Sequence, residues 1–95
     1  MSGEMREQMM FATDLADLIE LAGFPVAQVN VRGGGSVEVW PVKRSHGAAV
    51  AALLGLSDYV DYGVKSLDRP PFTTWSGTRN DFRVAIYGDT PAGVR

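Results

Sequence analysis

The sequence has 95 residues, a formal net charge of −2, a hydrophobic share of 45% and a charged share of 21%. These proportions exclude a disordered or membrane-spanning chain, and a chain of this length buries roughly 60–65% of its unfolded surface, so we expect one domain over residues 1–95. The absence of cysteine excludes disulfides and thiolate metal sites, and a single histidine argues against zinc. We therefore expect neither a metal nor a cofactor.

The charge and hydropathy patterns bear on where the protein acts. No apolar run approaches the roughly 20 residues that a bilayer crossing needs, and Glu4 and Glu7 around Arg6 do not follow the basic-then-apolar order of a signal peptide. We expect a cytoplasmic protein that does not contact the membrane. Residues 1–24 hold five acidic side chains against one arginine, which predicts a negative side and argues against tight, non-specific binding to nucleic acid.

The first predicted element is an amphipathic helix that runs from Phe11 to the stop at Gly23. One half of its helical wheel is apolar and holds Phe11, Ala12, Leu15, Ala16, Leu18, Ile19 and Ala22. The other half holds Asp14, Asp17 and Glu20. Met10 and Leu21 also lie on this acidic half, which is a weak indication of a partner surface, although single exposed apolar side chains are normal. Residues 1–8 show no apolar stripe, and we expect them to fray.

A β-hairpin follows, with strands at Val26–Arg32 and Ser36–Lys43 joined by three glycines that allow the positive φ values of a three-residue loop. Pairing Arg32 with Ser36 fixes the register and therefore the two faces. The apolar face is made by the pairs Val31/Val37, Val29/Val39 and Ala27/Pro41. The mixed face is made by Asn30/Glu38, Gln28/Trp40 and Val26/Val42.

A second helix, short and apolar nearly all round, is predicted over residues 47–54. We expect Ser45 to cap its start, and its apolar surface predicts that the helix lies buried on the apolar sheet face. Residues 57–67 then alternate as a strand would, although Ser57 and Asp58 can equally open a short helical turn.

The last predicted elements are the strands Phe72–Ser76 and Phe82–Gly88, joined by a five-residue loop of turn-forming residues. Pairing Ser76 with Phe82 predicts two faces. One face holds Thr74/Val84 and Phe72/Ile86, and the other holds Trp75/Arg83 and Thr73/Ala85. Residues 89–95 are expected to form a frayed tail.

The predicted fold class is α+β, with the element order α-β-β-α-β-β-β. About five mostly antiparallel strands form a sheet, and both helices pack on one face of it. The opposite face is left without cover, because no further element is predicted in the chain.

This uncovered face is the first candidate site. We expect it to carry Trp40, Trp75, Arg83 and Tyr87, with Gln28 and Asn30 beside them. Tryptophan, tyrosine and arginine dominate the energetics of protein interfaces, and the bases of single-stranded nucleic acid stack on aromatic rings, so the face suits either partner. A purely structural role is the alternative, in which each tryptophan packs against a neighbour and exposes only an edge.

Lys43, Arg44, Ser45 and His46 form the second candidate site, because they precede a predicted helix whose N-terminus presents unpaired amides and a partial positive charge. Two cations, a hydroxyl and an imidazole placed there can hold a phosphate, sulfate or carboxylate. The alternative is that Ser45 only caps the helix and that the two cations are solvated.

The acidic side chains do not predict catalysis. Asp14, Asp17, Glu20, Asp58 and Asp61 lack the partners and the loop spacing of recognisable metal or acid–base sites, and we expect them to be solvated. With no cysteine and no serine in a nucleophile-elbow context, the sequence offers no assembled nucleophile, base and oxyanion hole. We expect no enzymatic activity.

These observations favour a small, non-catalytic module that binds a protein partner or a second copy of itself as a homodimer. The size and the lack of catalytic groups also fit a phage or mobile-element inhibitor that acts by contact with a host protein. A binder of single-stranded nucleic acid is the alternative from another class, and it requires basic side chains around the two tryptophans, namely Lys65, Arg79 and Arg83. Binding of an anion or phosphate ligand at the second candidate site is the third interpretation.

Overall fold

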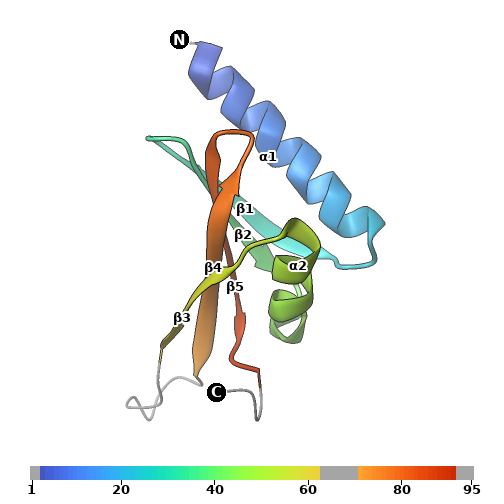
Figure 1. The fold of residues 1–95 in the computed structure, drawn as a ribbon. Coiled ribbons are helices and arrows are strands. Elements are labelled where there is room, and N and C mark those ends of the chain that lie inside the picture. Colours follow the sequence, from blue (N-terminus) through green and yellow to red (C-terminus); the bar gives the residue numbers. More distant parts are fainter. Residues whose placement is uncertain (1–2, 63–70, 92–95) are drawn as a thin grey trace.

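The computed structural model of the chain describes residues 3–62 and 71–91. Its elements in chain order are α1 (Gly3–Leu21), β1 (Val26–Arg32), β2 (Ser36–Pro41), the 3₁₀ turn η1 (Arg44–His46), α2 (Gly47–Leu54), β3 (Asp58–Tyr62), β4 (Phe72–Arg79) and β5 (Phe82–Asp89). The strands form one sheet in the order β1-β2-β5-β4-β3, in which β2 and β5 are parallel and the other neighbours are antiparallel (Figure 1). The predicted α+β class and element order are confirmed.

Both helices pack on the same face of the sheet. α1 lies mainly on β1 and β2, whereas α2 lies on β4 and β5 (Figure 1). The most deeply buried apolar side chains come from both layers and are Ile19, Val37, Val39, Val50, Val84 and Ile86. The core is therefore a single apolar layer between the helices and the sheet, and it is the hydrophobic effect at this layer that holds the fold together.

Helix α1 begins much earlier than the apolar pattern predicts. The expectation that residues 1–8 fray is wrong for residues 3–8, which are helical. The physical reason is Gln8, whose buried side-chain amide donates to the carbonyl oxygens of Arg32 (2.6 Å) and Ser36 (2.7 Å). These bonds anchor the first half of α1 to the turn between β1 and β2. A polar residue makes this anchor, so an apolar periodicity does not detect it.

The β1–β2 hairpin has the predicted register over most of its length. Arg32 pairs with Ser36, and the pairing continues in step to Gln28 opposite Trp40. The expected pairs Ala27/Pro41 and Val26/Val42 are wrong, because an irregularity between Val26 and Gln28 shifts Val26 opposite Pro41. A proline has no amide to donate to the ladder, so regular pairing is interrupted where it sits at the end of the strand.

The start of α2 differs from its predicted form. Ser45 does not cap the helix, because it lies inside the 3₁₀ turn, and His46 precedes α2 without a side-chain capping bond. The helix packs on the apolar sheet face as predicted, but it is not wholly buried there, since Leu53 is 42% exposed. One side of α2 packs on the sheet through Val50 and Leu54, and within the described residues nothing lies over its other side.

The turn between β4 and β5 is shorter than predicted. Asn80 and Asp81 form a two-residue turn with φ values of 50° and 68°, so Arg79 pairs with Phe82. Both residue types tolerate left-handed backbone, and a turn of this hand matches the twist of the two strands. The predicted pairing of Ser76 with Phe82 is therefore wrong by three residues. Because three is odd, every side chain of β4 faces the other way relative to β5.

The alternation after α2 correctly predicts a strand. β3 covers Asp58–Tyr62 and pairs antiparallel with β4, which decides against the alternative of a helical turn there. The rest of the predicted strand, residues 63–67, and most of the predicted tail, residues 92–95, lie outside the described residues. No helix in the described part of the chain is long and apolar enough to cross a membrane.

Candidate functional site

The face of the sheet opposite the helices is here called the outer sheet face. Alternation along each strand and the observed register assign to it Gln28, Asn30, Arg32, Ser36, Glu38, Trp40, Asp58, Val60, Tyr62, Phe72, Thr74, Ser76, Arg83, Ala85 and Tyr87. Neither helix lies over it (Figure 1). Aromatic and polar side chains of all five strands therefore lie on this face without a helix over them.

Two aromatic rings stack at the centre of the outer sheet face. Trp40 is the last residue but one of β2, and Tyr87 occupies the matching position on the parallel strand β5, one step beyond the pair Val39 and Ile86. The two rings lie nearly parallel, with centroids 4.1 Å apart and an angle of 5° between their planes. Such a pair is worth about 0.5–1.5 kcal/mol beyond its buried area. Trp40 is still 40% exposed, so one ring surface remains available.

A polar network holds the tyrosine of this stack. The Tyr87 hydroxyl donates to Glu38 Oε2 (3.0 Å), and Arg32 Nε donates to Glu38 Oε1 (3.0 Å). Burial by itself raises the pKa of the Glu38 carboxyl, but the bonds from Tyr87, Arg32 and Asn30 and the charge of Arg32 outweigh burial and lower this pKa below its ordinary value. Burial and the bond to Glu38 raise the pKa of Tyr87. Glu38 is therefore ionised and Tyr87 neutral at pH 7.

A second aromatic stack lies toward the β3 edge of the same face. The rings of Tyr62 and Phe72 have centroids 4.6 Å apart and an interplanar angle of 14°. Val60, which lies beside them on β3, is exposed. None of these three side chains was predicted to lie on the face. Phe72 was missed because the wrong β4–β5 register placed it among the core-facing residues.

Trp75 does not belong to the outer sheet face, and its predicted placement there is wrong. It pairs with Ile86 on the helix side of the sheet and is only 7% exposed. α2 covers it so closely that a Cβ on Gly47 would lie 2.8 Å from the Trp75 ring. The error follows from the register of β4, which differs from the predicted one by an odd number of residues. Trp75 therefore faces the helices, and its neighbours Thr74 and Ser76 face outward.

The other predicted members of the face lie where they were expected. Gln28 and Asn30 are on the outer sheet face, joined by a bond from Gln28 Nε2 to Asn30 Oδ1 (2.7 Å), and Arg83 is there with an exposed side chain. Arg79 is on the helix side instead, where it donates to the carbonyl oxygen of Leu54 (3.1 Å). Lys65 lies outside the described residues. Among the described residues, the basic cluster that a nucleic-acid face requires is therefore not assembled.

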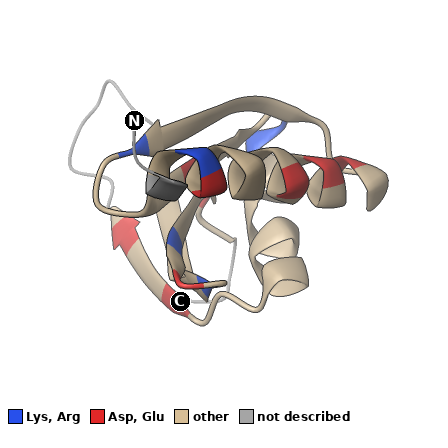
Figure 2. Ribbon diagram, turned by 90° about the horizontal axis from the view of Figure 1, so that it is seen from above, with Lys and Arg blue, Asp and Glu red and all other residues tan. Residues whose placement is uncertain are grey.

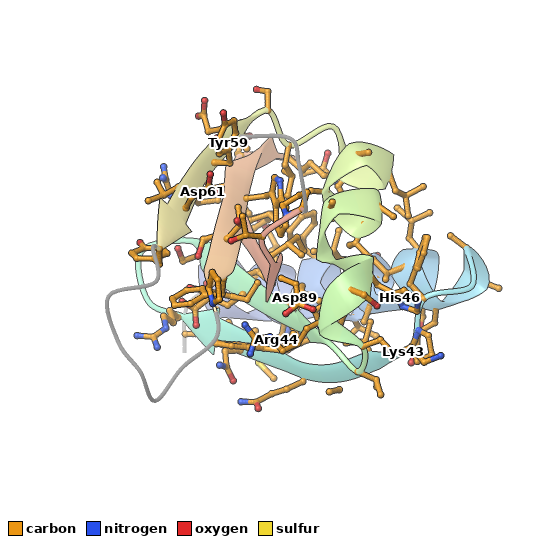
Figure 3. All side chains as sticks on the ribbon, turned by 90° about the horizontal axis from the view of Figure 1, so that it is seen from below. Lys43, Arg44, His46, Tyr59, Asp61 and Asp89 are labelled. Carbon is orange, nitrogen blue, oxygen red and sulfur yellow. The ribbon has the colours of Figure 1, made fainter. Side chains whose placement is uncertain are left out.

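The four residues of the predicted anion site do not converge on a common point. Arg44 forms an ion pair with Asp89, with 3.1 Å between Nε and Oδ1, so a carboxylate of the chain itself already accompanies it (Figure 3). The His46 ring packs edge-on against Phe24, with centroids 5.1 Å apart, and its Nδ1 is buried. Lys43 and Ser45 are exposed.

The acidic side chains are spread over the surface. Figure 2 shows acidic positions spread along α1. The side chains of Asp14, Asp17 and Glu20 on α1 and of Asp58 on β3 are exposed. Asp61 accepts a hydrogen bond from the Thr73 hydroxyl (2.6 Å). Within residues 3–62 and 71–91, no three histidine, aspartate or glutamate side chains gather closely enough to hold a metal ion.

Comparisons with known proteins do not assign the chain to a family. No model of a known protein family matches the chain, and no curated protein sequence matches it.

Proposed function

We propose that this chain is a small, non-catalytic protein-docking module that binds its partner through the outer sheet face. The observation that carries the proposal is the pair of aromatic stacks, Trp40 with Tyr87 and Tyr62 with Phe72, on a sheet face over which neither helix lies. Tryptophan, tyrosine and arginine are the residues that most often carry the energy of protein interfaces. The exposed Arg83 adds the third of these types to the same face.

The outer sheet face is also well ordered before any partner arrives. Tyr87 is fixed by its stack on Trp40 and by its bond to Glu38, and Glu38 is fixed in turn by Arg32. Binding loses affinity when flexible side chains must be ordered, at about 0.5–1.5 kcal/mol for each one. Aromatic rings that are already held by strands and by each other avoid most of that cost. This favours a docking role over a loose, incidental surface.

Single-stranded nucleic acid is a weaker candidate for this face. Phosphate binding draws its energy from several arginine or lysine contacts, but Arg32 is already paired with Glu38, and Arg79 points to the helix side. Of the three basic residues that this alternative requires, Arg83 alone lies on the outer sheet face within the described chain. The anion-binding alternative is weakened in the same way, because Arg44 is paired with Asp89.

The test compares two exposed side chains on opposite layers of the molecule. Trp40 and Leu53 are similarly exposed, at 40% and 42%. Affinity capture from the cells that produce the protein, together with sedimentation velocity of the purified protein, should show that Trp40→Ala weakens association with a partner protein or a second copy at least about tenfold. Leu53→Ala should leave this association unchanged.

Three results would contradict the proposal. The first is equal loss of association in the Trp40→Ala and Leu53→Ala variants. The second is a wild-type protein that captures no partner and stays monomeric at high concentration. The third is tight binding of a single-stranded oligonucleotide whose affinity falls steeply with salt and whose salt dependence flattens in Arg83→Ala, which would favour the nucleic-acid alternative.

A further inference from the structure

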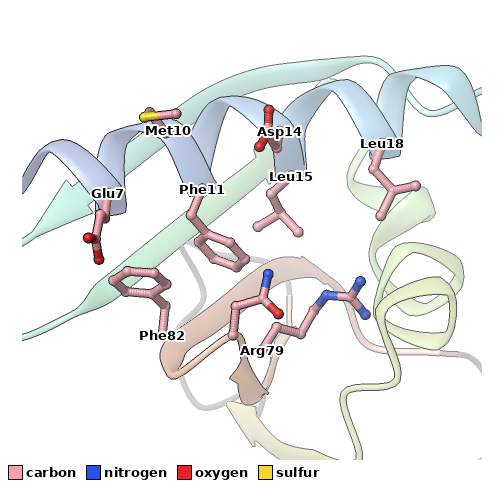
Figure 4. A pocket seen from close by; sticks show the side chains of 9 residues that line it. Glu7, Met10, Phe11, Asp14, Leu15, Leu18, Arg79 and Phe82 are labelled. Carbon is pink, nitrogen blue, oxygen red and sulfur yellow. The ribbon is translucent and has the colours of Figure 1, made fainter. Parts of the chain in front are cut away.

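A groove lies between α1 and the β4–β5 turn, on the helix side of the sheet and away from the outer sheet face. Its volume is about 320 Å³. The floor is apolar, because Phe11 of α1 stacks on Phe82 of β5 with centroids 4.9 Å apart, and Leu15 lies beside them (Figure 4). α1 packs mainly on β1 and β2, and the groove lies where α1 passes the end of the β4–β5 hairpin.

An apolar stripe on α1 extends this groove along the helix. Met10 and Leu18 line the groove, and Leu21 continues their line one turn further on. The exposed fractions are 61% for Met10 and 87% for Leu21. Spacings of eight and three residues place all three side chains within one narrow arc of the helix surface. The groove and the stripe together extend along α1 from Glu7 to Leu21, for about 21 Å or four helical turns.

Acidic side chains alternate with the apolar ones along the same arc. Glu7 and Asp14 both line the groove, and both are exposed. The guanidinium of Arg79 also lines it but is directed to the carbonyl oxygen of Leu54. Arg6, the one basic residue of α1, lies outside this groove and lines a neighbouring hollow with Met9, Met10, Thr13 and Asp14. The two carboxylates that line the groove, Glu7 and Asp14, therefore outnumber the one cation that lines it, Arg79, and they lie around an adaptable, methionine-containing apolar surface. Figure 2 shows that acidic positions outnumber basic ones along α1.

We infer that this groove, with the stripe on α1, is a second docking site whose ligand is a basic amphipathic helix of another protein. A helix of about four turns, with apolar side chains at i, i+4, i+7 and i+11 and lysine or arginine beside them, matches both the length and the charge of the site. Methionine suits such a site because its flexible thioether adapts to the helix that packs on it.

Charge complementarity selects this occupant over two others. A second copy of the chain packing its own α1 stripe here would bring Glu7 and Asp14 of both copies together, which like-charge repulsion opposes. An anionic membrane surface is opposed for the same reason. The inference does not rest on the proposed function, because the two sites use opposite layers of the molecule.

The experiment measures fluorescence anisotropy of a labelled synthetic peptide bound to the full chain. The peptide has 15 residues with leucine at i, i+4, i+7 and i+11 and lysine at the flanking positions, and the control peptide has glutamate in place of each lysine. Adjacent residues provide matched variants, since Met9 is 53% and Met10 61% exposed, yet Met9 lies outside the groove. Asp14 and Asp17 form a second matched pair, because both are exposed on α1 and only Asp14 lines the groove.

The lysine peptide should bind, and the glutamate peptide should not. Met10→Ser and Asp14→Lys should each weaken binding at least about fivefold, whereas Met9→Ser and Asp17→Lys should change it less than about twofold. Trp40→Ala should leave the affinity unchanged. The inference is overturned if the lysine peptide fails to bind at low salt, if both peptides bind equally, or if the matched controls lose as much affinity as the groove variants. Loss of binding in Trp40→Ala would also overturn it, by moving the peptide to the outer sheet face.

Discussion

Two adjacent threonines on β4 face opposite sides of the sheet, and their hydroxyl groups differ in hydrogen bonding. Thr73 faces the helix side, where its hydroxyl donates to Asp61 Oδ1 (2.6 Å) and lies 2.9 Å from the hydroxyl oxygen of Thr90. Thr74 faces the outer sheet face, and its hydroxyl oxygen is buried without a hydrogen-bond partner among the described residues. A buried hydroxyl stabilises a fold only when it is hydrogen-bonded.

Replacing each threonine with valine, which keeps the shape and removes the hydroxyl, should therefore give opposite results. Thr73→Val should lower the free energy of unfolding by about 1–3 kcal/mol, because it breaks these bonds. Thr74→Val should change the free energy by less than about 0.5 kcal/mol or increase it. Urea denaturation of both variants measures the difference. Equal losses in the two variants would contradict the assigned register of β4.

The Glu38 carboxyl predicts a defined dependence of stability on pH. Its pKa in the folded protein is lowered from the ordinary value of 4.5, so its contribution to stability is fully present above that value and is lost as the pH falls through the lowered pKa. The Glu38→Gln variant lacks this titration. The difference in unfolding free energy between wild type and Glu38→Gln should therefore shrink from pH 7 to pH 3. A difference that stays constant or grows toward low pH would show that Glu38 is not held by Tyr87 and Arg32.

At the scale of elements, the close approach of α2 to the sheet depends on two glycines. A Cβ on Gly88 would lie 2.7 Å from the Arg44 carbonyl oxygen and 2.8 Å from the Gly47 Cα atom. No real Cβ is tolerated at such distances without movement of the backbone. The helix can cover Trp75 because both positions lack a side chain.

Gly88→Ala should accordingly push α2 away from the sheet and lower the free energy of unfolding by about 1–3 kcal/mol. Gly33→Ala is the matched control, because a Cβ there meets nothing within 4 Å. Its effect on the free energy of unfolding should stay within about 0.5 kcal/mol. Chemical denaturation measures both. A Gly88→Ala protein as stable as the control would mean that α2 does not contact β5 in this way.

The two hairpins show what sequence patterns can and cannot fix. The first register is predictable, because three consecutive glycines define the loop and the flanking valines alternate. The second is not, because the turn uses Asn80 and Asp81 in left-handed conformations, and the residues before it look equally like loop residues. Placing the turn across Gly77–Asp81 instead of these two residues shifts the register by an odd number, which exchanges the two faces of β4.

At the scale of the whole molecule, the sequence predicts the two layers and an uncovered aromatic face, but not every member of it. Trp40 and Tyr87 lie on that face as predicted, because the β1–β2 register near Trp40 and the alternation of side chains along β5 are both predicted correctly. Trp75 lies beneath α2. The groove beside α1 depends on how α1 packs relative to the β4–β5 turn, which no local sequence pattern predicts. The sequence indicates this groove only through Met10 and Leu21, two apolar residues on the acidic half of the predicted helix.

The central claim is that the outer sheet face binds a protein, and site-specific photocrosslinking in the producing cells tests it most directly. The photoreactive residue p-benzoylphenylalanine replaces Trp40 in one protein and Leu53, of similar exposure, in the other. Irradiation should join the protein substituted at position 40 to a partner protein or to a second copy, seen as a discrete higher-mass band and identified by mass spectrometry. The protein substituted at position 53 should give no such band. No protein adduct at position 40, or the same adduct at both positions, would contradict the account.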